Sequence, residues 1–201
     1  MRRLTVYIKT IAPFPAELQI EFFKIVKVLQ LMPGEWIPDD LPSGTSIFVE
    51  EGFLLLTTCT DNQWKCSNFY VEGFLALTYS EGAPEMREGS FRVRAAEPSL
   101  VYYLTVEEEG KLKKIFPNWP GVSRFLRQRS FLKNQGLISL FRVPPTDRII
   151  YADKHFGFLF RAPLQDLIDF LDLQTEAEKV VLDFIQRERH SPNKQLLVSN
   201  N

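Results

Sequence analysis

The spacing of apolar residues between positions 161 and 185 limits the possible folds of this chain more than any other feature. Two groups of apolar residues recur there at intervals of three and four, the period of a helix face, and a short polar stretch around Asp172 separates them. Two helices joined by so tight a turn are typical of a helix-turn-helix. The residues predicted to be buried are Leu167, Ile168 and Leu171 in the first helix and Val180, Val181 and Phe184 in the second.

The charge of this segment conflicts with that prediction. In a helix-turn-helix the second helix enters the major groove of DNA, yet here it opens with Glu176 and Glu178 against Lys179. Residues 163–190 contain seven acids and three Lys or Arg, whereas residues 111–146 contain eight Lys or Arg and no acid. The net charge of -1 therefore hides a positive segment that lies apart from the predicted reading helix.

The composition is that of an ordinary globular protein. A chain of 201 residues, of which 45% are hydrophobic, can bury the core of one large domain or of two small ones. No stretch approaches the roughly 20 uninterrupted apolar residues of a membrane helix. Residues 1–14 are too short and too interrupted for a signal peptide, so we expect a cytoplasmic protein with no membrane partner.

The chain offers little for catalysis or for metal binding. Cys59 and Cys66 flank the turn-like residues 60–63 and could face each other across a hairpin, but cytoplasmic thiols are usually reduced. His155 and His190 are far apart in sequence, and the chain has no nucleophile-elbow, phosphate-loop or zinc-protease motif. We expect no metal, no cofactor and no enzymatic activity.

Short β-prone segments dominate the first half of the chain. A helix is predicted over residues 13–32, because prolines stand at its start and apolar residues follow at helical spacing. A second helix is predicted over residues 106–115. Many short strands between two helices predict a sandwich or a rolled antiparallel barrel. The predicted strands are residues 35–37, 45–48, 52–59, 63–70, 91–95 and 101–104.

A long amphipathic helix is predicted between Pro120 and Pro144, because apolar residues recur there every three or four positions. We expect its apolar stripe to pair with the same stripe of a second copy, which would make the protein a homodimer. The alternative is that the stripe packs only on the chain's own strands. The predicted interface residues are Val122, Phe125, Leu126, Leu132, Leu137 and Leu140.

These elements predict an α+β fold with three parts. Residues 1–120 form an antiparallel, jelly-roll-like β-roll with flanking helices, and residues 121–142 form the long connecting helix. Residues 143–201 form a helical domain, in which residues 146–147 cap a further helix and residues 195–198 are one strand of a hairpin.

The order of these parts resembles the Crp/Fnr family of dimeric bacterial transcription regulators, and three sequence segments support the resemblance. Residues 31–36, Leu-Met-Pro-Gly-Glu-Trp, are similar to the Gly-Glu turn that opens the family's β-roll. Residues 93–99 resemble its late β-roll strand, and residues 163–181 resemble its helix-turn-helix, with the proline and the apolar spacing kept. The resemblance covers nearly the whole chain and implies a cyclic-nucleotide-binding-like β-roll followed by a winged helix-turn-helix.

The DNA-reading residues that the resemblance implies depart from the family's pattern. Ile168 stands where the family has a small residue, and Asp172 stands where it has the turn glycine. Residues 177–180 replace the family's contact set and remove its guanine-reading arginine. The expected base contacts are Gln174, Thr175, Glu178 and Lys179, and the expected phosphate contacts are Arg187, Arg189 and Lys194.

The ligand site that the resemblance implies also departs from the pattern. Cyclic-nucleotide-binding members hold the phosphate with an arginine and a hydroxyl residue, but here Gly89 precedes Ser90. Arg87 or Arg92 would have to substitute, among nearby acids that repel a phosphate. We therefore expect no response to cyclic nucleotides and leave the effector unassigned. The alternative is a β-roll filled by its own aromatic side chains, to which the 17 phenylalanines contribute.

Two functions follow from these expectations. The first is a Crp/Fnr-like regulator that binds duplex DNA as a two-fold dimer and changes the spacing of its reading helices when an effector binds. The second is a dimeric sensor or protein-interaction module that has kept the fold and lost specific DNA binding. Steep loss of DNA affinity with rising salt separates them, because only the first predicts it.

Overall fold

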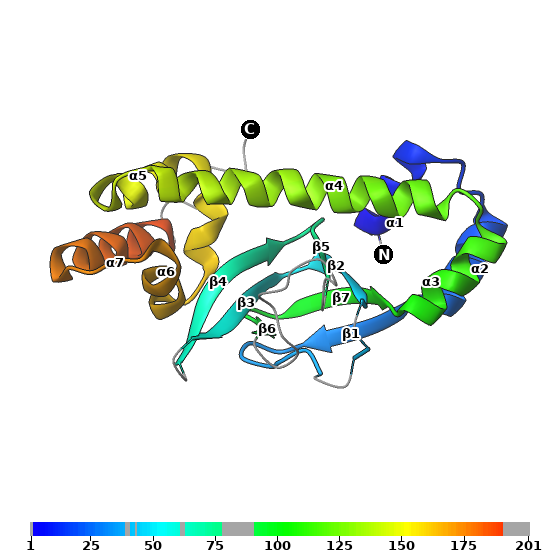
Figure 1. The fold of residues 1–201 in the computed structure, drawn as a ribbon, viewed down its shortest axis with the longest axis horizontal. Coiled ribbons are helices and arrows are strands. Elements are labelled where there is room, and N and C mark those ends of the chain that lie inside the picture. Colours follow the sequence, from blue (N-terminus) through cyan, green and yellow to red (C-terminus); the bar gives the residue numbers. More distant parts are fainter. Residues whose placement is uncertain (1, 39–40, 43, 61–62, 78–90, 191–201) are drawn as a thin grey trace.

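The computed structural model describes residues 2–38, 41–42, 44–60, 63–77 and 91–190. Over these residues the chain forms two antiparallel sheets that face each other, with helices at both ends and along one side (Figure 1). The strands are β1 (Lys27–Leu31), β2 (Ser46–Glu51), β3 (Phe53–Thr60), β4 (Gln63–Val71), β5 (Leu75–Leu77), β6 (Phe91–Ala95) and β7 (Ser99–Leu104). The helices are α1 (Arg2–Ile11), α2 (Ala16–Ile25), α3 (Val106–Ile115), α4 (Trp119–Ile138), α5 (Pro145–His155), α6 (Leu164–Leu171) and α7 (Glu176–His190).

The strands in the described part of the chain make a β-roll. One sheet has the order β1-β7-β2-β5 and the other the order β4-β3-β6, and every pairing is antiparallel. Successive residues of a strand point to opposite faces, so one sheet can contribute to a core on each side. In β2, Val49 belongs to the core inside the roll, whereas Phe48 belongs to a second core between this sheet and α1, α2, α3 and α4. The predicted α+β class and rolled antiparallel architecture are confirmed.

The predicted helix over residues 13–32 is wrong at both ends. An unpredicted helix, α1, precedes it, and its first backbone amides donate to the buried Glu50 carboxylate, at 2.7 Å from Arg3 and 3.0 Å from Leu4. Pro15 directly precedes α2, which ends at Ile25, and residues 27–31 instead form β1 along β7. Hydrogen bonding to a neighbouring strand therefore overrides the helical spacing of the sequence.

Other predicted elements agree with the structure to different degrees. The helix over residues 106–115 is α3, whose start is fixed by a capping box between Thr105 and Glu108. The short strand at residues 35–37 is reduced to a single bridge between Trp36 and Arg94. The hairpin of β3 and β4 is present, but its register pairs Cys59 with Trp64 and places Cys66 opposite Thr57. The two thiols therefore do not face each other, and both are free.

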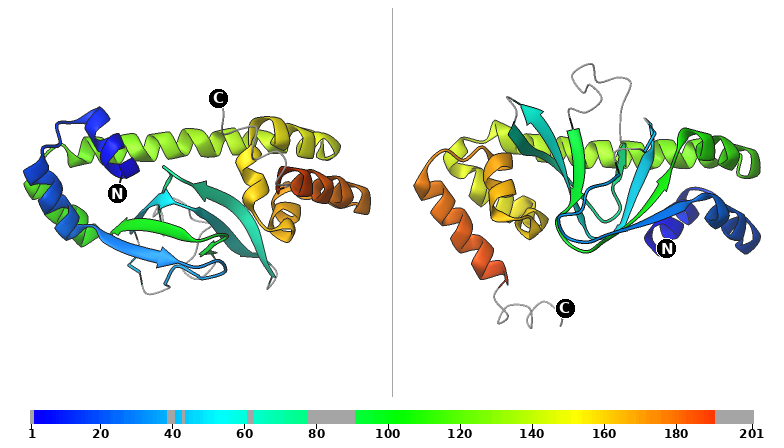
Figure 2. Two further views of the ribbon diagram at one scale, coloured as in Figure 1. Left: turned by 180° about the vertical axis from the view of Figure 1, so that it is seen from behind. Right: turned by 90° about the horizontal axis from the view of Figure 1, so that it is seen from below.

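The helix α4 runs along the whole β-roll and carries the C-terminal helices at its far end (Figure 1). A short 3-10 helix (Ser139–Arg142) follows α4 directly, and a second one (Gly157–Arg161) joins α5 to α6. Figure 2 shows from two further sides that α6 lies beside the sheet of β3 and β4, while α7 lies at the outer edge of the molecule. No helix within the described ranges is long and apolar enough to cross a membrane.

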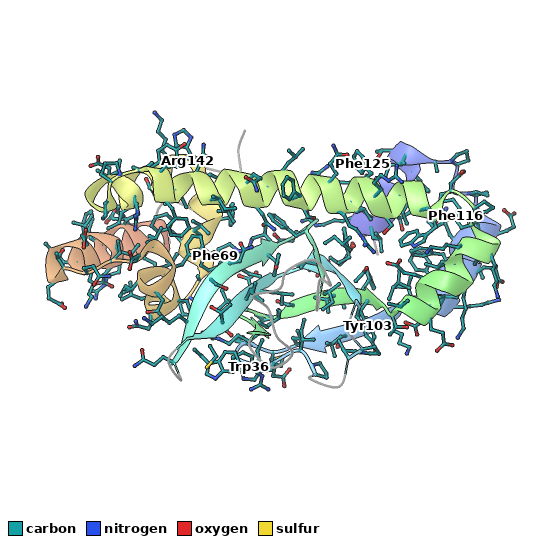
Figure 3. The ribbon with its side chains drawn as sticks, in the orientation of Figure 1. Trp36, Phe69, Tyr103, Phe116, Phe125 and Arg142 are labelled. Atoms are coloured by element: carbon teal, nitrogen blue, oxygen red, sulfur yellow. The ribbon has the colours of Figure 1, made fainter. Side chains whose placement is uncertain are left out.

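The core inside the β-roll continues without a break into the C-terminal helices. Phe69 of β4 stacks on Phe53 at 5.4 Å between ring centroids and meets Phe170 of α6 edge-on at 4.5 Å. Figure 3 shows Phe69 on the side of β4 that faces the C-terminal helices. Phe158 of the second 3-10 helix contacts Phe53 from the same side. The position of α6 is therefore fixed by the β-roll itself.

Candidate nucleic-acid interface

The turn of the helix-turn-helix has the geometry that the sequence predicts. Asp172 ends α6 with φ 55° and ψ 52°, which is the left-handed region, and the amide of Leu173 donates to the carbonyl of Ile168 at 3.1 Å. Aspartate tolerates this region better than most residues, so it can replace the glycine of the family's pattern. Its carboxylate accepts a hydrogen bond from the Gln174 side-chain amide at 2.7 Å.

Replacing Asp172 with valine is expected to lower the free energy of unfolding by about 1–2 kcal/mol, because a β-branched residue is strained in the left-handed region. Urea denaturation measures the change. The matched control is Asp169→Val, one turn earlier on α6, where the backbone is helical and the loss should be clearly smaller. Equal losses in the two variants would mean that the turn stores no backbone strain.

The start of α7 is closed by a second capping box. The Glu178 carboxylate accepts from the Thr175 amide at 2.9 Å and from the Gln174 amide at 3.1 Å, and the Glu178 amide donates to the Thr175 hydroxyl at 3.2 Å. Hydrogen bonds from the backbone and the hydroxyl of Thr175 lower the pKa of Glu178. A carboxylate therefore stays ionised at the N-terminal end of α7, where its negative charge interacts favourably with the helix dipole.

The face that α7 buries differs from the predicted one. Leu182 is fully buried and Ile185 packs against the core, whereas Val180 is 66% exposed and Phe184 is 63% exposed. The prediction that Val180, Val181 and Phe184 anchor this helix is therefore wrong. The physical reason is that apolar residues occupy positions 180–182 and 184–185, which surround most of the helix, so their spacing does not select one face.

The first helix of the pair is buried much as predicted. Leu167 and Leu171 are fully buried, and Ile168 is partly buried against the core. Arg148 of α5 secures this helix, because its guanidinium donates to the carbonyl of Leu171 at 2.9 Å. Asp166 forms an ion pair with Arg94 of β6 at 2.5 Å. Burial raises the pKa of Asp166 although Arg94 acts in the opposite direction.

The predicted DNA-contacting residues that the structure describes lie together at one end of α7 and along it. Gln174 and Thr175 are exposed beside the turn. The Lys179 ammonium pairs with Glu176 at 2.9 Å, and the Arg187 guanidinium pairs with Asp183 at 2.6 Å. The side chain of Arg189 and all of Lys194 lie outside the described residues. The cations of α7 that are described are thus partly neutralised within the helix.

The predicted dimer interface divides into a buried and an exposed part. The side chains of Val122, Leu126, Leu137 and Leu140 are fully buried in the chain's own core, so their assignment to a dimer surface is corrected. The stripe packs on the β-roll because α4 lies along its full length (Figure 1). Phe125 and Leu132 remain on the outer side, with Leu132 61% exposed, and Figure 3 shows Phe125 on the side of α4 away from the sheets.

The predicted ligand residues are only partly described. Arg87 and Ser90 lie outside the described residues. Arg92 projects from the same face of β6 as Arg94, which contacts α6, and its guanidinium lies over the Trp36 ring at 4.5 Å from the centroid. Val93 alone of these three neighbours points into the roll. Arg92 is therefore directed away from the interior of the roll.

One ion-pair network in this region was not predicted from the sequence. The guanidinium of Arg161, in the second 3-10 helix, donates hydrogen bonds to both Glu72 and Glu97 of the β-roll. Two of its nitrogens lie 2.8 Å and 3.0 Å from the Glu72 carboxylate oxygens. No sequence motif marks this ion-pair network, since Arg161 lies 64 positions from Glu97 and 89 from Glu72.

Within the described ranges, no three His, Cys, Asp or Glu side chains gather as a metal site would require.

The described part of the chain combines a β-roll, a long helix along it and a helix-turn-helix at the end of that helix. No family model and no curated protein sequence matches this chain. Several solved structures do match it. A cyclic-nucleotide-binding-domain protein of Listeria monocytogenes matches with a TM-score of 0.61 and 13% identity, over 92% of this chain and 89% of that one.

Two further matches have the same architecture. The c-di-GMP-responsive global regulator CLP of Xanthomonas campestris matches with a TM-score of 0.58 and 16% identity, over 84% of this chain and 91% of that one. A protein of Eubacterium rectale assigned to the Crp/Fnr family of transcriptional regulators matches with a TM-score of 0.58 and 11% identity, over 87% and 84%. The chain therefore has the Crp/Fnr fold, including both the β-roll and the C-terminal helices.

Proposed function

We propose that this protein is a dimeric, DNA-binding transcription regulator of the Crp/Fnr type and not an enzyme. The observation that carries this proposal is the helix-turn-helix itself, because the left-handed turn at Asp172 presents α7 at the outer edge of the molecule (Figure 2). The three-part division into residues 1–120, 121–142 and 143–201 belongs to this proposal. So do the base contacts by Gln174, Thr175, Glu178 and Lys179 and the phosphate contacts by Arg187, Arg189 and Lys194.

Selection of genomic DNA fragments by the purified protein tests DNA binding. Because a dimer presents two reading helices, we expect enrichment of a two-fold-symmetric site with half-sites roughly 10 base pairs apart. No enrichment over random fragments would contradict the proposal.

Dimer formation is proposed through the outer face of α4. Phe125 and Leu132 are both exposed and lie seven residues apart. In paired helices the same contact position recurs every seven residues, so both side chains can lie on one contact line. Gln128 lies between them, so the seam is only partly apolar. Two-fold pairing of this face would leave the buried side of α4 on the β-roll undisturbed.

Replacing Leu132 with glutamate, alone or together with Phe125→Glu, is expected to convert the dimer to a folded monomer, because two carboxylates would oppose each other across the axis. Sedimentation velocity measures the change. Ile20→Glu is the matched control, since Ile20 is equally exposed on α2 and should leave the dimer intact. Leu126→Glu tests folding instead, because Leu126 is buried. An unchanged dimer in Leu132→Glu would remove α4 as the interface.

We propose that the regulator does not respond to cyclic nucleotides. The sequence has Gly89 where the family's phosphate-binding arginine stands, and Arg92 points away from the roll interior toward Trp36. A guanidinium held over an indole ring outside the roll cannot neutralise a phosphate inside it. The bound effector, if the function requires one, is a different molecule.

A second function is favoured by the outer face of α7. Val180 and Phe184 are exposed on it, and the neighbouring cations pair with acids of the same helix. An exposed apolar face whose neighbouring cations are already paired with acids favours contact with another protein over contact with DNA phosphates. The alternative function is therefore a dimeric interaction module without specific DNA binding. If this alternative is correct, the protein should bind all DNA sequences with similarly weak affinity.

A further inference from the structure

A groove of about 620 Å³ opens between α3 and α4, on the outside of the β-roll. Its size matches that of sites for small organic ligands. Its walls carry side chains from both helices, and it lies outside the roll interior and apart from α7. The lining residues that bear on its chemistry are Glu109 and Lys113 of α3 and Ser123, Arg124, Arg127 and Phe131 of α4.

The charges in this groove leave two cations available. The buried Glu109 carboxylate accepts from the Ser46 hydroxyl at 2.8 Å and from the Arg127 guanidinium at 3.2 Å, so Arg127 is neutralised at the base of the groove. Lys113 and Arg124 are exposed, and neither has an ion-pair partner among the described residues. The groove therefore offers a net positive charge to a ligand, and both cations belong to the positive segment of residues 111–146.

An aromatic wall stands next to these cations. Phe131 is 58% exposed and lines the groove together with Pro120. A ring this exposed gains free energy when a second apolar surface covers it. The groove thus combines a guanidinium, an ammonium and an apolar surface within one concave site.

We propose that the α3–α4 groove binds a small phosphate monoester that carries an aromatic ring, a class that excludes cyclic nucleotides, which are phosphodiesters. Arg124 holds two phosphate oxygens through the planar fork of its guanidinium, Lys113 supplies a second positive charge, and the ring lies against Phe131. The site is an effector site outside the β-roll, and so it goes beyond the regulator function proposed above. Its test requires no DNA.

The proposed site and the proposed dimer face occupy adjacent strips on the exposed side of α4, and Gln128 borders both. At 100° per residue, Arg124, Arg127 and Phe131 lie on one flank of the exposed surface, while Phe125 and Leu132 lie on the other. Neither Phe125 nor Leu132 lines the groove. The two proposals rest on different principal residues, so calorimetry on the groove variants and sedimentation of Leu132→Glu test them separately.

Titration of the full chain with phenyl phosphate by isothermal calorimetry tests the proposal. We expect saturable binding that weakens about three- to tenfold in Lys113→Gln and in Arg124→Gln, because each removes one charge-assisted contact in an open groove. Lys114→Gln is the matched control, since Lys114 is exposed on α3 but does not line the groove, and its affinity should stay within about twofold of the wild type. No saturable binding, or equal weakening in all three variants, would overturn the proposal.

Two further arms identify the ligand class. Phe131→Ala should weaken phenyl phosphate binding and leave inorganic phosphate binding unchanged; equal effects on both would remove the aromatic part of the proposal. Co-sedimentation with phosphatidylglycerol vesicles distinguishes a lipid headgroup from a free phosphate. We expect no more protein on these vesicles than on phosphatidylcholine vesicles, and recruitment that Arg124→Gln abolishes would overturn the choice of a free ligand.

Discussion

Replacing Phe69 with alanine is expected to lower the free energy of unfolding by about 3–5 kcal/mol, the usual cost of removing a buried aromatic ring. Phe69 is fully buried between Phe53 of the β-roll and Phe170 of α6. Its loss leaves a cavity at the place where the two halves of the molecule join. Urea denaturation followed by circular dichroism measures the change.

The control for this variant is Phe131→Ala, which removes the same ring from an exposed position on α4 and should cost less than about 0.5 kcal/mol. A loss below about 1 kcal/mol for Phe69→Ala would show that α6 does not pack on the sheet in solution. Unfolding in two separate transitions would show that the C-terminal helices are a separate unit. We expect a single transition, because one apolar core spans both parts.

Replacing Arg161 with alanine is expected to destabilise the protein by about 2–4 kcal/mol at neutral pH, since it leaves two acidic side chains facing each other without their cation. The guanidinium of Arg161 donates to both carboxylate oxygens of Glu72 and also to Glu97. All three side chains are only partly exposed, so solvent screens this network less than a surface pair. Glu97→Gln in the same background should recover part of the loss.

The effect of Arg161→Ala is expected to depend on pH. Burial alone would raise the pKa of Glu72, but the hydrogen bonds from Arg161 outweigh it and the pKa is lowered. A carboxyl group with a lowered pKa stabilises the folded state above its ordinary value of 4.5, and this contribution is lost as the pH falls below it. The difference in stability between wild type and variant should therefore shrink between pH 5 and pH 3. A constant difference would mean that Arg161 acts through packing alone.

The elements that were predicted correctly from the sequence are those with local signals. The helix α3 starts at Val106, directly after Thr105, because Thr105 and Glu108 form a capping box, and this pattern is visible within four residues. The turn at Asp172 follows from a polar residue between two apolar helical segments. The β3–β4 hairpin was also predicted, because turn residues separate two β-prone runs.

The features that were missed depend on contacts between distant residues. Residues 27–31 have helical spacing, yet they form β1 because β7 lies beside them. The apolar stripe of α4 was assigned to a partner, but α4 buries Val122 and Leu126 against its own sheet. The face of α7 was assigned wrongly because apolar residues surround most of the helix. Periodicity shows that a helix has an apolar face and does not show what covers it.

Fluorescence anisotropy of a labelled duplex at about 0.05 and 0.2 M salt tests DNA binding by α7 most directly. The duplex is the fragment most enriched by selection, and a shuffled sequence of the same composition is its control. Wild-type protein should bind it at least about tenfold more weakly at the higher salt, which corresponds to about two phosphate contacts, and Arg187→Gln should weaken binding while Lys24→Gln on α2 does not. Equal and weak affinity for the selected and shuffled duplexes would contradict the regulator function and leave the apolar face of α7 as a protein-binding surface.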